Sequence, residues 1–97
     1  MGKYVYVSYM STVPELNPEI FLEKILPRLE NEDIKIIARG VAIGVPEGFC
    51  IVYETDLDVK EFIDFRVDAF TVDGKNMIDH TTTMVIINEK DIFSRNL

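Results

Sequence analysis

The only histidine of the chain, His80, is the side chain best suited to move a proton near neutral pH. It stands in the segment MIDHTTT, with Asp79 beside it. His80 could act as a general acid or base oriented by Asp79 or by another acid. It is our catalytic candidate, and the alternative is a histidine at a strand end with no chemical role.

A second candidate, Arg39, interrupts the apolar run IIARGVAI. A guanidinium within such a strand must reach a sheet edge or meet a buried acid. Its planar fork could clamp the carboxylate of a ligand through two hydrogen bonds. It could equally pair with Glu54 or with an acid of a second copy of the chain.

Aromatic side chains follow the same strand-like segments and could line an apolar cleft. Phenol groups at a cleft mouth hold flat ligands by stacking and by hydrogen bonds. Packing in a core or an interface explains the same residues. The candidate ligand-binding residues are Arg39, Tyr4, Tyr6, Phe49 and Tyr53.

Metal and cofactor chemistry has no supporting motif. One histidine and one cysteine, Cys50, provide no zinc spacing, and Cys50 lies in an apolar segment typical of an inert thiol. The acids Asp56 and Asp58 lack the spacing of a calcium loop, and GVPEG is no phosphate-binding loop. We expect no metal and no cofactor.

Composition limits the partners of the chain. Its 97 residues, 47% hydrophobic and 28% charged, suit one globular domain over residues 1–97. A formal net charge of −7 disfavours nucleic acid and anionic lipid surfaces. No apolar run approaches the ~20 residues of a membrane span, and no secretion signal stands at the N-terminus. We expect a cytoplasmic protein.

The elements that must position these residues follow from apolar periodicity and from helix and turn signals. Pro27 should kink or end the first helix, and Gly40 and Gly44 should bulge or bend the second strand. Residues 66–78 fit either a helix end or a hairpin around Asp73-Gly74. We predict strands at 3–10, 33–43, 49–55 and 81–87, helices at 18–31 and 55–70, and a helical turn near Ile92 and Phe93.

The order βαββαβ predicts an α+β fold of the ferredoxin-like type, an antiparallel four-stranded sheet with two helices on one face. Both faces of its strands are apolar, so the uncovered face needs a cover. At about 25 cal/mol per Å², a bare patch on the order of 500 Å² forgoes roughly 12 kcal/mol. A second copy of the chain is the expected cover.

In this respect the chain resembles the dimeric α/β barrels, in which two ferredoxin-like protomers pack sheet to sheet. Residues 35–54 (KIIARGVAIGVPEGFCIVYE), followed by residues 55–65, resemble small uncharacterised prokaryotic proteins of that group. The run HTTTMVIIN and the overall layout are similar to the ligand-sensing domain of Lrp/AsnC regulators, without their DNA-binding helix-turn-helix. The resemblance implies a homodimer and a small-molecule pocket.

Three functions are therefore open. The first is a non-catalytic homodimer that binds a small, mainly apolar molecule between sheet and helices. The second is a cofactor-free monooxygenase or isomerase of the dimeric-barrel kind, using His80, Arg39 and a tyrosine. The third is a structural or protein-interaction module that presents a sheet edge or an acidic helix face.

Overall fold

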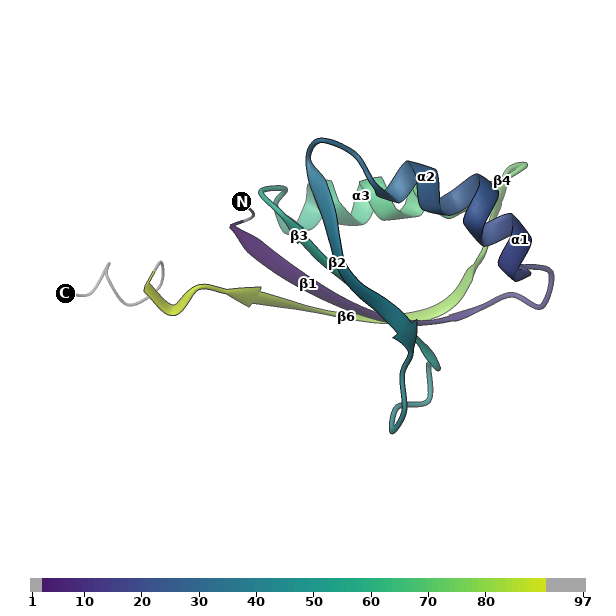
Figure 1. Ribbon diagram of the computed structural model, residues 1–97, viewed down its shortest axis with the longest axis horizontal. Coiled ribbons are helices and arrows are strands. Elements are labelled where there is room, and N and C mark those ends of the chain that lie inside the picture. The colour runs from purple at the N-terminus through teal and green to yellow at the C-terminus, as the bar shows by residue number, and fades with distance from the viewer. Residues whose placement is uncertain (1–2, 91–97) are drawn as a thin grey trace.

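The computed structural model describes residues 3–90, which form an α+β fold of sheet and helices (Figure 1). In chain order the elements are β1 (Tyr4–Thr12), α1 (Pro18–Ile20), η1 (Phe21–Ile25), α2 (Leu26–Leu29), β2 (Ile34–Val41), β3 (Phe49–Thr55), α3 (Val59–Ala69), β4 (Thr71–Val72), β5 (Lys75–Asn76) and β6 (Ile78–Ile87). The predicted turn near Ile92 and Phe93 lies outside the described residues.

Four of the strands make one antiparallel sheet in the order β2-β3-β1-β6, so β2 and β6 are its edges. The helices all lie over one face of this sheet (Figure 1). The predicted α+β class, the four antiparallel strands and the two helical segments are confirmed. The hairpin β4-β5 forms a separate two-stranded sheet.

The first helical segment runs through α1, η1 and α2 without a break, from Pro18 to Leu29. Asn17 caps its start by accepting a hydrogen bond from the backbone N–H of Ile20. Pro27 has no N–H to continue the α-helical ladder. The chain widens into a π-helical turn before it, where the Leu26 N–H donates to the Phe21 carbonyl. The predicted disturbance at Pro27 is thus a π turn.

Helix α3 begins with a capping box in which Asp58 and Glu61 each bond the other's backbone N–H. The helix ends at Ala69, and the Asp73-Gly74 turn then joins β4 to β5. Residues 66–78 therefore hold both a helix end and a hairpin, because αL backbone at Asp73 and Gly74 reverses the chain.

The bulge in β2 lies at Ile37 and not at Gly40 or Gly44, whereas the alternative prediction, a bend, is met at Gly44. Gly40 stays in register opposite Cys50, and Gly44 lies beyond the strand in a loop with positive φ. The extra residue, Ile37, has no Cα partner on β3 and is 51% exposed. A bulge absorbs one residue and shifts the alternation of faces that follows it.

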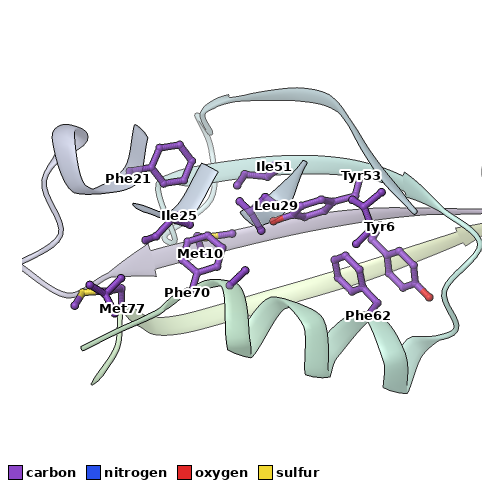
Figure 2. Packing of buried hydrophobic residues seen from close by; sticks show 13 residues of the cluster. Tyr6, Met10, Phe21, Ile25, Leu29, Ile51, Tyr53, Phe62, Phe70 and Met77 are labelled. Atoms are coloured by element: carbon purple, nitrogen blue, oxygen red, sulfur yellow. The ribbon is translucent and has the colours of Figure 1, made fainter. Parts of the chain in front are cut away.

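The core fills the space between the helices and the covered face of the sheet (Figure 2). Buried aromatic and aliphatic side chains meet there from β1, β3, the first helical segment and α3. They are Tyr6, Met10, Phe21, Ile25, Leu29, Ile34, Ile51, Tyr53, Phe62, Ala69, Phe70, Val72 and Met77. The buried residues of α3 are Phe62, Arg66 and Ala69, whereas its apolar Val59 and Ile63 are 50% and 40% exposed.

No described helix covers the opposite face of the sheet (Figure 1). The register aligns a row of apolar side chains across its four strands, from Ala38 through Val52 and Val7 to Met84. Neighbouring positions on this open face add further apolar groups, namely Val5, Tyr9, Cys50 and Ile86. Met84 and Ile86 are 49% and 57% exposed.

The described residues contain no helix long and apolar enough to cross a bilayer.

Candidate functional site

A groove of about 340 Å³ lies between the first helical segment and the strand ends beneath it. It is bounded by the β1 end and the loop after it, by α1 and η1, by β2 and β3, and by the end of α3. Its lining residues are Thr12, Leu16, Asn17, Pro18, Phe21, Leu22, Arg39, Phe49 and Phe70. None of them is acidic.

Three phenylalanines give the groove an aromatic wall. Phe21 meets the ring of Phe49 edge to face at 5.6 Å and lies tilted against Phe70 at 6.3 Å between ring centroids. Phe21 and Phe70 are buried, and Phe49 is half-buried. Edge contacts of this kind are a favourable packing geometry for aromatic rings.

Arg39 lies at this groove with its guanidinium carbon 5.8 Å from the centroid of the Phe21 ring. The side chain is exposed, and no ion pair found within residues 3–90 includes it. The bulge at Ile37 sets its direction. Arg39 lies opposite the buried Ile51 and so shares the helix face of the sheet, where regular alternation from Ile36 would have placed Ala38.

The candidates Tyr6 and Tyr53 lie elsewhere, around the Phe62 ring (Figure 2). Tyr6 stacks on that ring at 4.0 Å, and Tyr53 meets it edge to face at 5.0 Å. The Tyr6 hydroxyl donates to the Leu57 carbonyl at 2.8 Å. Tyr4 is tilted against Tyr6 at 6.1 Å. Of the five ligand candidates, the structure brings together only Arg39 and Phe49 at the groove.

The phenol groups of this cluster differ in their hydrogen bonding. The hydroxyl of Tyr53 is fully buried and has no partner among the described residues. Burial raises the pKa of Tyr53, although the positive charge of Arg66 opposes that rise. Burial also raises the pKa of Tyr6. Both phenols are therefore neutral at physiological pH.

The catalytic candidate His80 lies on β6, the edge strand opposite to the one that carries Arg39. Its side chain is 68% exposed, and its Nε2 lies 3.9 Å from the Glu47 carboxylate. Register places His80 on the open face of the sheet, whereas Arg39 lies on the helix face. The structure does not bring these two residues together.

Arg66 is a buried cation that the sequence-based analysis did not single out as a candidate. It is 6% exposed, and its guanidinium donates to the hydroxyls of Ser8 and Thr83, with Thr81 nearby. Its Nε has no hydrogen-bond partner within residues 3–90. Burial lowers the pKa of Arg66. The sequence feature that could have revealed its burial is its position four residues after Phe62, which puts both side chains on one face of the helix.

Neither metal ligands nor a reactive thiol gather at the groove. Across residues 3–90, no three or more His, Cys, Asp or Glu side chains are grouped so that they could hold a metal ion. Cys50 faces the open side of the sheet, and burial raises the pKa of its thiol.

No protein-family model matches the chain, and no similar protein was found among curated proteins or solved structures.

Proposed function

We propose that this chain is a small-molecule-binding domain that acts as a homodimer and catalyses no reaction. The observation that carries the proposal is the aromatic groove between the first helical segment and the sheet. We further propose that the domain has the ferredoxin-like layout of the dimeric α/β barrels. Binding in the groove and pairing through the open sheet face are then two separate uses of one sheet.

The composition of the groove supports ligand binding. Ligand pockets in proteins are mostly apolar, with a few polar groups that fix orientation. Here Phe21, Phe49 and Phe70 provide the apolar wall, and Thr12, Asn17 and Arg39 add polar groups to the lining. Its volume of about 340 Å³ falls in the range of small-molecule sites.

The ferredoxin-like layout is supported by the strand order β2-β3-β1-β6. The connection from β1 to β2 runs through the first helical segment and passes over β3, and the connection from β3 to β6 runs through α3 and passes over β1. Both helical segments lie on the same face, which is the split βαβ pattern. The hairpin β4-β5 is an insertion between α3 and β6.

Pairing is supported by the open face. Its central row, Ala38, Val52, Val7 and Met84, is apolar across all four strands. Stable interfaces bury about 800 Å² on each partner, an area that a four-stranded sheet face can supply. A second copy matches such a patch with an equally apolar one, and a two-fold axis closes the assembly.

The enzyme alternative has one observation in its favour, the approach of His80 to Glu47 at 3.9 Å. A general base with a carboxylate beside it is a common catalytic pair. The apolar groove, however, lies on the other face of the sheet from His80. We therefore propose ligand binding as the first function, catalysis as the second and a purely structural role as the third.

Native mass spectrometry of the purified protein tests the proposal, because it reports subunit number and retained ligand together. We expect a dimer, with added mass that disappears under denaturing conditions. A monomer with nothing bound would contradict both parts. A dimer that takes up no aromatic or aliphatic compound in ligand-observed NMR screening would favour the structural or protein-interaction module.

A further inference from the structure

We infer that the ligand of the groove is an amphipathic carboxylate, with its acid group on Arg39 and an aromatic or short aliphatic body among the phenylalanines. The inference rests on the proposed binding function and names its ligand class.

Within residues 3–90, Arg39 is a cation without an acidic partner, although the protein is acidic overall. The chain has a net charge of −7, with 17 acids against ten bases. Even so, Arg39 enters none of the ion pairs of the described chain, and no acid lines the groove. An anionic head group would therefore meet one positive charge and no negative one among the residues that line the groove.

The guanidinium is oriented before any ligand arrives. It lies 5.8 Å from the Phe21 centroid, a cation–π distance that restrains the flexible side chain beside the groove. A guanidinium presents parallel N–H groups that match the two oxygens of a carboxylate. Restraining the donor before binding reduces the entropy lost on complex formation.

The remaining walls select the body of the ligand. Leu16, Phe21 and Phe49 offer apolar surface to a ring or a short chain. The Asn17 side-chain oxygen already accepts the Ile20 N–H at 2.8 Å, which leaves its amide N–H groups to donate. The groove thus presents donors and apolar surface, a combination suited to an acid or an acyl compound rather than to a cation.

A matched ligand pair tests the inference: 2-naphthoate and the neutral 2-naphthalenemethanol, titrated into the full-length protein and followed by backbone amide chemical shifts. We expect naphthoate to bind at least tenfold more tightly and to shift the signals of Phe21 and Phe49. In Arg39→Gln, naphthoate should bind no more tightly than the alcohol binds to the wild-type protein. Arg39→Lys should recover part of the difference, because it restores the charge without the fork.

Lys35→Gln is the control, since it removes the same charge from the same strand on the opposite face of the sheet. It should leave the preference for naphthoate unchanged. Equal binding of acid and alcohol would overturn the carboxylate inference and leave the binding function standing. Failure of both compounds to bind would overturn the two together. A preference lost equally in Lys35→Gln and Arg39→Gln would show general charge attraction and would also overturn the inference.

Discussion

Tyr6 and Tyr53 both contact the ring of Phe62, but only the hydroxyl of Tyr6 has a hydrogen-bond partner among the described residues. Tyr6→Phe removes the bond to the Leu57 carbonyl and should lower the free energy of unfolding by about 1 kcal/mol. Urea denaturation at neutral pH measures this change. An unchanged midpoint would mean that water replaces the phenol at Leu57.

The same substitution at Tyr53 should act in the opposite direction. Tyr53→Phe removes a buried hydroxyl that has no partner among residues 3–90 and leaves the ring packed, so the free energy of unfolding should rise by about 1 kcal/mol. Tyr6→Phe is the matched comparison in the same denaturation series. A destabilised Tyr53→Phe would reveal a hydrogen bond that the structure does not contain.

Tyr53 also predicts a dependence of stability on alkaline pH. Its pKa is raised in the folded protein, so the folded state holds this proton more tightly than the unfolded chain. Below the ordinary tyrosine pKa of about 10, both states keep the proton and its linkage does not lower the free energy of unfolding. Above that pH the unfolded chain loses the proton first, so the free energy of unfolding falls. The stability gap between Tyr53→Phe and wild type should therefore widen above pH 10 in urea titrations. A constant gap would contradict the raised pKa.

Sequence reasoning placed Arg39 and Phe49 among the ligand candidates, and the structure sets both at the groove. It could not separate the tyrosines from them, because both faces of the first strand read as apolar. The direction of Arg39 depends on a one-residue bulge at Ile37. Ile36 and Ile37 are the same residue type, so nothing in the sequence marks which of them leaves the register.

Among the secondary-structure elements, α3 has the most complete start, with reciprocal bonds between Asp58 and Glu61. Asp58→Ala should lower the free energy of unfolding by about 1 kcal/mol, because a backbone N–H at the helix start loses its acceptor. Thermal and urea denaturation measure the loss. Asp64→Ala on the same helix removes only an exposed pair with Lys60 and should cost no more than about 0.5 kcal/mol. Equal effects would rule out a specific role for the cap.

Elements with strong local signals were predicted to within a few residues. The 49–55 strand and the Asp73-Gly74 turn have the predicted positions because their residue types and backbone demands agree. The π turn before Pro27 resulted from a conflict between proline geometry and the burial of Phe21, Ile25 and Leu29. Sequence reasoning located that conflict but could not say how the backbone resolves it.

At the scale of the whole molecule, the open sheet face predicts which substitution would break the proposed dimer. Met84 is 49% exposed and lies beside Val7 in the central apolar row. Met84→Lys would bury a charge in the proposed interface and should weaken dimerisation at least tenfold in sedimentation equilibrium. Val67→Lys, on the outer side of α3, is the control and should leave the dimer intact. A Met84→Lys dimer as tight as wild type would exclude this face as the interface.

The edge formed by β2 has a consequence for solubility. An edge strand with free backbone groups can recruit strands from other molecules and extend into fibrils. The bulge at Ile37 breaks the regular spacing of those groups, and the charged Lys35 and Arg39 stand on either side of it. The bulge that directs Arg39 toward the groove therefore also makes the β2 edge a poor template for amyloid-like growth. Removing Ile37 would straighten this edge and increase the risk of aggregation.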